Sequence, residues 1–218
     1  MSLSILFKDE LNGFYRSKVM LTLWVGLPVM ALLLYVLSPD LEGISISGFV
    51  AVMVGSIGGM LSSVMIVISI LNDREKGTYD LFFVRPLKRS NMVIAKFMAV
   101  YLCVAIAAFL AILLGTVTDT VVNETDIITN LDMVAETALT ALSMMAITCS
   151  AGVLIGVFSP SILVGILLVL YGGNQLSVVV LMPMLMEGSD LLFTVSVGTA
   201  ISIVMLALAS FFFQRRTA

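Results

Sequence analysis

The chain has 218 residues, of which 60% are hydrophobic and 11% are charged, with a formal net charge of −3. Soluble domains carry charged residues at about 25%, so no soluble core could bury this apolar surface, and lipid must solvate most of it. The sequence contains no histidine. This excludes haem-ligating membrane cytochromes, HExxH-type metalloproteases and Ser-His hydrolases, because each of them needs an imidazole.

The first predicted element is an amphipathic helix over residues 1–18. Apolar side chains recur there at a spacing of three to four, at Leu3, Phe7, Leu11 and Phe14. This pattern predicts a helix that lies on the cytoplasmic surface of the membrane, and a frayed polar tail is the alternative. The segment lacks the apolar stretch and the small-residue cleavage site of a signal peptide, so we expect none.

Six apolar stretches follow, each long enough to cross about 30 Å of hydrocarbon as a helix of about 20 residues. They cover approximately residues 19–37, 46–71, 92–115, 133–157, 161–182 and 192–213. Lipid requires each span to satisfy its own backbone groups, which predicts an all-α integral membrane protein with one transmembrane domain over residues 1–218. Pro160 divides the fourth span from the fifth, because proline disfavours helix in the residue before it.

The basic residues predict the orientation. In a six-span topology all eleven lie on one side: Lys8, Arg16, Lys18, Arg74, Lys76, Arg85, Lys88, Arg89, Lys96, Arg215 and Arg216. Nine acidic residues lie on or near the other side: Asp40, Glu42, Asp119, Glu124, Asp126, Asp132, Glu136, Glu187 and Asp190. Positive charge marks the cytoplasmic face, so both termini are predicted to be cytoplasmic.

The cytoplasmic loop over residues 72–91 separates the second and third spans. The second span is predicted to continue as a charged helix until Gly77, since glycine commonly follows a helix C-terminus. Thr78 is a good N-cap for a short new helix, and Asp80 suits its first turn. That helix must end before Pro86. It is rich in aromatic residues, which fits either an anchor in the headgroup layer or a knob that docks into a cytosolic partner.

The sequence Glu75-Lys76-Gly77-Thr78-Tyr79-Asp80-Leu81, with Arg85-Pro86, Arg89 and Lys96 after it, resembles a known signature. It is similar to the E-x-G-T-x-(E/D)-L…P…R…K pattern of permeases of the type-two ABC transporter family. Arg16-Ser17-Lys18, the Arg215-Arg216 ending and the predicted layout also resemble that family. Phe82-Phe83-Val84 departs from it, since leucines and small polar residues are commoner there, and this puts the identity of the partner in doubt.

The resemblance implies a permease that exports its substrate across the plasma membrane. The loop would form a coupling helix against a cytosolic ATPase subunit, through Glu75, Gly77, Thr78, Asp80, Arg85, Pro86 and Arg89. It also implies a second permease copy or homologue and two ATPase subunits, which bind ATP and magnesium. The chain lacks G-x-x-x-x-G-K-(S/T), so we expect no enzymatic activity and no cofactor on it. Its expected partners are these subunits and lipid, without nucleic acid.

Small residues form a stripe on the second span. Gly55, Gly59 and Ser63 share one helical face at the small-xxx-small spacing that allows helices to approach closely. Tight packing is the predicted role, and a wall of the transport pathway is the alternative. The fifteen methionines are scattered over the spans, which favours adaptable packing rather than a Cu(I) site.

Four residues with charged or amide side chains fall within the predicted spans. Asn174 and Gln175, in the fifth span, are predicted either to join helices by hydrogen bonds or to face a translocation path or dimer interface. Glu136, about one turn inside the fourth span, is interpreted as a rim residue or as a gate. Lys96, one turn inside the third span, is expected to extend back to the headgroups.

Two other classes of function compete with the permease. A secondary transporter or channel acting alone would need charged or broken helices near the midplane, and the spans offer only Asn174, Gln175 and Glu136 for this. A membrane enzyme would need a cluster of catalytic groups, and the sequence provides none. The spans show no ring of charge to select ions, which favours an amphiphilic or hydrophobic substrate.

Overall fold

The computed structural model describes residues 3–37, 46–76, 89–123, 127–173, 175–176 and 191–216. These residues are almost entirely helical, without a β-strand among them. The helices are α1 (Leu3–Tyr15), α2 (Lys18–Leu37), α3 (Ile46–Glu75), α5 (Arg89–Asn123), α6 (Ile127–Phe158), α7 (Ile162–Leu168), the π-helix η2 (Val169–Gly173) and α9 (Leu191–Arg216). The predicted all-α class is therefore confirmed for the described chain.

Four of these helices are long and apolar enough to cross a membrane by themselves, over Phe49–Glu75, Ser90–Thr118, Val134–Phe158 and Leu192–Phe213. A fifth candidate is the bent pair of α1 and α2, whose axes differ by 68°. The helices α7 and η2 together form only a shorter apolar segment, Ile162–Gly173. The chain thus has the helices of a multi-pass membrane protein. The rest of the predicted fifth span, residues 177–182, lies outside the described residues, and the count of six stays a prediction.

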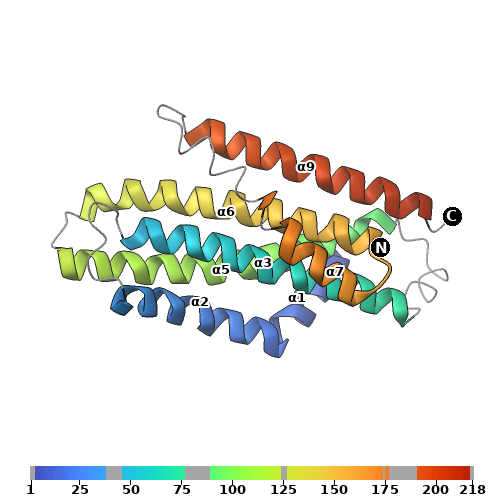
Figure 1. Ribbon diagram of the computed structural model, residues 1–218, viewed down its shortest axis with the longest axis horizontal. Coiled ribbons are helices and arrows are strands. Elements are labelled where there is room, and N and C mark those ends of the chain that lie inside the picture. Colours follow the sequence, from blue (N-terminus) through green and yellow to red (C-terminus); the bar gives the residue numbers. More distant parts are fainter. Residues whose placement is uncertain are drawn as a thin grey trace.

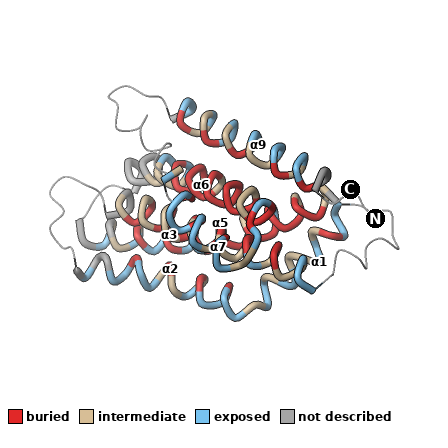
Figure 2. Tube along the Cα trace, turned by 45° about the vertical axis from the view of Figure 1, so that its right-hand side comes forward, coloured by how far each residue is buried: buried red, intermediate tan, exposed pale blue. Residues whose placement is uncertain are grey.

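The long helices lie side by side in a bundle (Figure 1). Helices α3, α5 and α6 form its middle, with α2 on one outer side and α9 on the other (Figure 1). Burial follows this order, since 72% of the spanning window of α6 is buried but only 22% of that of α9 (Figure 2). The apolar exposed faces of α2 and α9 are therefore the surfaces that lipid or other subunits would cover.

Helix α3 packs most extensively against α6, through small residues on both helices. A Cβ added to Gly55 would lie 3.1 Å from Ala141 Cα, and one added to Gly152 would lie 2.8 Å from Ser63 Cα. A Cβ added to Gly59 would meet the side chain of Thr148. The predicted packing role of the stripe on α3 is confirmed, and α6 contributes a small residue of its own at each end of the contact.

The turn between α6 and α7 matches its predicted position. Helix α6 ends at Phe158, and Ser161 caps α7 by accepting a hydrogen bond from Val164 N at 3.5 Å. The Arg74 guanidinium donates to the Ser159 carbonyl at 3.3 Å. This contact places the end of α3 next to the turn, so the C-terminal ends of α3 and α6 lie at the same end of the bundle.

Helix α1 forms where it was predicted, but its most buried apolar residue is a different one. Leu6 is buried and packs with Met92 and Ala95 of α5, while Leu3, part of the predicted membrane-facing stripe, is exposed. Leu11 and Phe14 pack against the main core. Much of the apolar face of α1 is therefore turned toward protein, because α5 offers it an apolar surface that the one-dimensional pattern could not reveal.

Candidate functional site

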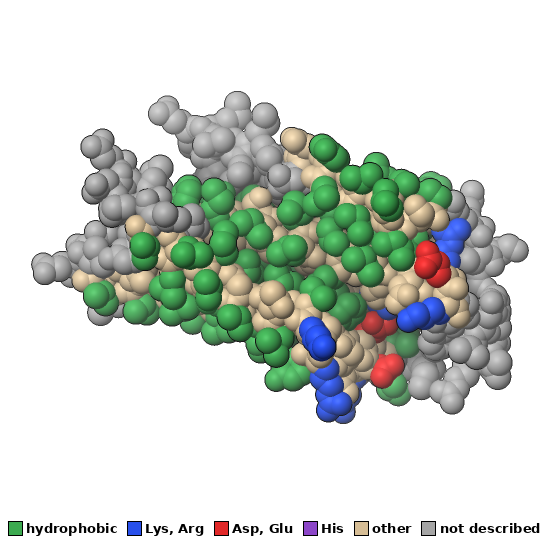
Figure 3. Space-filling view, turned by 60° about the horizontal axis from the view of Figure 1, so that its bottom comes forward, with side chains coloured by type: hydrophobic (Ala, Val, Ile, Leu, Met, Phe, Trp, Pro, Cys, Tyr) green, Lys and Arg blue, Asp and Glu red, His purple; other side chains and the backbone are tan. Residues whose placement is uncertain are grey.

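The charged side chains of the described residues collect at one end of the bundle. Lysines, arginines and carboxylates gather toward this end of the face shown in Figure 3, and apolar side chains cover much of the rest. They come from α1, from the turn between α1 and α2, from the end of α3 and from the start of α5. Glu136, on α6, lies apart from them. Among these groups one set is buried and specific enough to form a site.

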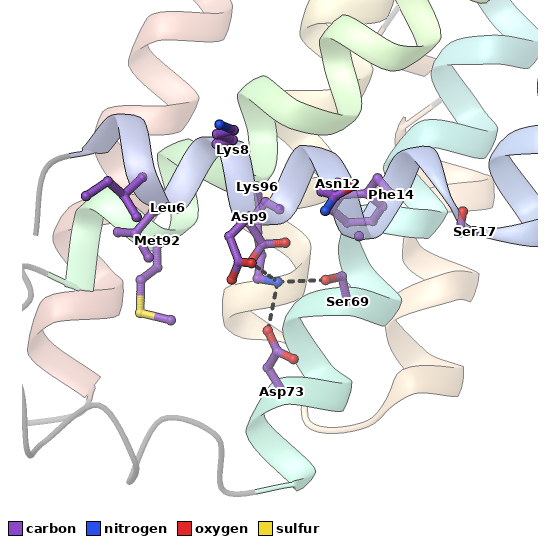
Figure 4. A pocket seen from close by; sticks show the side chains of 13 residues that line it. Leu6, Lys8, Asp9, Asn12, Phe14, Ser17, Ser69, Asp73, Met92 and Lys96 are labelled. Carbon is purple, nitrogen blue, oxygen red and sulfur yellow. Dashed lines mark hydrogen bonds and ion pairs between the residues drawn. The ribbon is translucent and has the colours of Figure 1, made fainter.

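Lys96 of α5 is the centre of this set. Its Nζ lies 2.8 Å from Glu10 Oε1 of α1 and 2.7 Å from Asp73 Oδ2 of α3, and it donates to Ser69 Oγ of α3 at 2.9 Å. Figure 4 shows the ammonium pointing between the two helices toward Ser69 and Asp73. A lysine ammonium has three N–H donors, and each has one partner here. We call Lys96, Glu10, Asp73 and Ser69 the Lys96 cluster.

Burial makes the Lys96 cluster sensitive to change. The Lys96 side chain is only 4% exposed, whereas the Glu10 and Asp73 side chains are each 25% exposed. A buried ammonium is costly unless paired and hydrogen-bonded. Two carboxylates meet one ammonium, so the three ionised groups carry a formal charge of −1. Partial exposure lets water solvate that excess charge.

Local helix geometry explains how the cluster assembles. Ser69 and Asp73 are four residues apart, which puts both on the same face of α3. Leu6 contacts Met92, and one turn further along each helix Glu10 meets Lys96. An apolar contact thus sets the register of α1 on α5, and the ion pair follows from that register.

The structure corrects the prediction that Lys96 extends back to the headgroups. Lys96 is 3% exposed and turned into the protein. The physical reason is that α1 folds over α5 and provides a carboxylate within reach, while α3 provides a second one. Sequence reasoning did not identify Glu10, Asp73 or Ser69 as site residues. The available signal was a lysine inside an apolar helix, because such a residue needs a partner.

A cavity of about 840 Å³ adjoins the cluster. Its lining comes mostly from α1, with Ser69, Asp73, Met92 and Lys96 from α3 and α5. Lys8 and Asp9 add a further charge of each sign to the wall. Among the described residues, no group of three or more His, Cys, Asp or Glu residues is arranged to hold a metal ion. The arrangement can hold three helices together through one buried ammonium.

The predicted coupling residues are only partly described. Glu75 is the last residue of α3 and is exposed, which agrees with the predicted helix before Gly77. Arg89 is the first residue of α5, and its side chain is outside the description. The other five, namely Gly77, Thr78, Asp80, Arg85 and Pro86, lie outside the described residues. The ends of α3 and α5 that flank this segment are the same ends that carry the Lys96 cluster.

The residues proposed for a translocation path are not part of this site. Glu136 is exposed on α6, 22 residues before its end, or about 33 Å at about 1.5 Å per residue. Gln175 is exposed just after η2, and Asn174 lies outside the described residues. The three residues stay candidates for a path or a contact between helices, separate from the Lys96 cluster.

A scan against protein-family models finds no match, and no curated protein is similar to the chain. A functional assignment therefore depends on the residues of the chain itself.

Proposed function

We propose that the chain is the membrane-embedded permease subunit of a type-two ABC transporter, and that it exports a substrate with work from a separate cytosolic ATPase. The signature from Glu75 to Lys96 supports the family. The Lys96 cluster carries the mechanism, because it joins α1 to the end of α3 and the start of α5, the two helices that residues 77–88 connect in the chain.

The proposed mechanism is mechanical. A partner that binds residues 77–88 pulls on the end of α3 and the start of α5 together. Because Lys96 holds Asp73 and Glu10 within 2.8 Å, α1 is attached to the same unit. The three helices then move as a rigid body, and the small-residue contact passes the movement from α3 to α6. An ATP-driven change in the partner can shift the permease between two states only if the partner binds them with different affinity.

The proposed topology has six spans in the plasma membrane, with both termini cytoplasmic. The distribution of basic residues supports this orientation. A second permease copy or homologue would complete the path, and the exposed apolar faces of the outer helices leave room for it. ATP and magnesium would bind to the ATPase subunits.

Cysteine cross-linking tests the proposal. Both native cysteines are free and buried, so a single introduced cysteine is the reactive one. Glu75→Cys, at the exposed end of α3, should cross-link in mild detergent to a cytosolic protein that hydrolyses ATP. Val121→Cys provides the matched control, because Val121 is 75% exposed at the far end of α5.

Two outcomes would contradict the proposal. One is that Glu75→Cys captures no ATPase although both variants are equally reactive toward a small maleimide. The other is that the purified protein moves its substrate without any ATPase, driven by an ion gradient. The second result would establish the competing function, a secondary transporter or channel.

A further inference from the structure

A second cavity, of about 430 Å³, lies between α1, α2 and α5. Helix α1 lines it with Lys8, Leu11, Asn12 and Tyr15, at the spacing of a single helical face. Helix α2 contributes Trp24, and helix α5 contributes Leu102, Cys103 and Ile106. We call this cavity the Trp24 groove. Its volume lies within the roughly 300–1,000 Å³ of small-molecule sites.

One wall of the Trp24 groove is apolar and faces outward. Leu102 and Ile106 are 40% and 41% exposed, and their separation of four residues puts them on the same face of α5. Both belong to a segment that is long and apolar enough to cross a membrane, Ser90–Thr118. Lipid is the solvent of such a surface, so an acyl chain is the natural neighbour of this wall.

The Trp24 groove also has polar and aromatic lining residues. Lys8 is the charged residue among the described residues of the lining. The Trp24 indole donates a hydrogen bond to the Cys103 carbonyl at 3.2 Å. It also packs edge-on against the Tyr15 ring, with 5.5 Å between the ring centroids, and these two contacts hold both rings in place. Tryptophan and tyrosine are enriched at the level of the headgroups. The groove thus combines one basic residue and two interfacial aromatic rings with an apolar wall.

The charges near the Trp24 groove favour an anionic ligand. Arg16 and Lys18 are exposed at the turn between α1 and α2, close in sequence to Tyr15. Glu10, a carboxylate of the same helix that lines the larger cavity, is paired with Lys96. Asp9 is exposed and lines that larger cavity but not the groove. Basic residues beside a bilayer attract anionic lipids.

We propose that the Trp24 groove binds an anionic diacyl phospholipid, with an acyl chain along Leu102 and Ile106 and the headgroup phosphate at Lys8. The site requires only that the chain sits in a bilayer, and it does not depend on the ATPase partner. A bound lipid would lie under α1 and so would support the helix that also carries Glu10.

Trp24 is the only tryptophan of the chain, so its fluorescence reports on the groove. The full chain is reconstituted into vesicles with equal mole fractions of phosphatidylglycerol and phosphatidylcholine, and the acyl chains of one or the other lipid carry bromine as a quencher. Brominated phosphatidylglycerol should be enriched about fivefold at Trp24, the effect of one lysine near an anionic lipid. Lys8→Gln should remove this preference. Lys76→Gln, at an exposed lysine just past α3, should keep it.

Equal quenching by the two brominated lipids would overturn the proposal, as would equal effects of Lys8→Gln and Lys76→Gln. A protein partner or second copy in the groove would shield Trp24 from both lipids, which also overturns it. Soluble glycerol phosphate separates a headgroup site from a lipid site. Glycerol phosphate should leave the preference of the groove for phosphatidylglycerol intact. If glycerol phosphate abolished that preference, the acyl chain would contribute nothing to binding, and the proposal of a lipid site would be wrong. Leu102→Phe with Ile106→Phe puts larger side chains in the place of the acyl chain, so it should reduce quenching by brominated phosphatidylglycerol.

Discussion

Helix α3 is held in two different ways along its length. In the middle, Gly55 and Ser63 meet Ala141 and Gly152 of α6 so closely that an added methyl group would contact backbone atoms. At its end, Asp73 and Ser69 bind the Lys96 ammonium, and the Asp73 side chain is 25% exposed. The first contact depends on shape and admits one arrangement. The second depends on charge and reaches water, so it tolerates small side-chain movements while it keeps α1, α3 and α5 joined.

The largest expected effect comes from removing the charge. Lys96→Met leaves Glu10 and Asp73 facing each other without their cation, and we expect a loss of about 3 kcal/mol of unfolding free energy, near the low end for breaking a buried ion pair. Thermal unfolding in detergent measures it. A triple variant, Glu10→Gln, Asp73→Asn and Lys96→Met, removes all three charges and should recover most of the stability. A single variant as stable as the parent would show that the pair is not formed.

The shape-dependent contact should respond to a single methyl group. In Gly152→Ala the new Cβ would lie 2.8 Å from Ser63 Cα, so α3 and α6 must separate, at a cost of about 2 kcal/mol for overpacking. Gly26→Ala on α2 is the matched control, because no heavy atom of another described helix lies within 4 Å of its Cβ position. Unfolding in detergent should show a loss for the first and none for the second. Equal behaviour would contradict the close approach.

A smaller effect is expected where α1 docks on α5. Leu6 is 9% exposed, against Met92 and Ala95. Leu6→Ala should cost about 1.5 kcal/mol of docking free energy from lost apolar burial. Hydrogen exchange should then rise in α1 while α3 and α6 stay protected. Ile5→Ala, at a residue 51% exposed, should leave exchange unchanged, and a rise of the same size there would argue against docking through Leu6.

The smallest effect is expected at Trp24. Trp24→Phe keeps an aromatic ring and removes the hydrogen bond to the Cys103 carbonyl, which is worth about 1 kcal/mol. The unfolding temperature should fall slightly. Thr22→Ala is the control, because its exposed hydroxyl donates only to Lys18 O of its own helix. A larger loss in the control than at Trp24 would contradict the assignment of this bond.

Sequence reasoning succeeded where the structure follows from neighbours along the chain. The long apolar helices, the turn at Pro160 and the packing stripe on α3 all depend on local pattern, and the structure has them. It failed at Lys96, because the position of that side chain depends on α1 folding back across α5. A residue at position 10 and one at position 73 become partners only through the register set by Leu6, and no periodicity encodes that register.

The sequence also does not identify the proposed partner protein. The signature around Glu75 predicts a coupling helix, but a motif of this length names a family and not the protein that docks there. The Lys96 cluster adds a physical reason for coupling, since it attaches α1 to the helices on either side of the predicted loop.

The most direct test of the proposed permease role measures transport per ATP hydrolysed in the triple neutral variant, reconstituted with the ATPase that the proposal requires. If the Lys96 cluster transmits work, the variant should insert and bind the ATPase normally, while transport per ATP falls by about tenfold, within the range of coupling between linked sites. Unchanged transport per ATP in a stable triple variant would contradict the account, because the three charges would then serve folding alone.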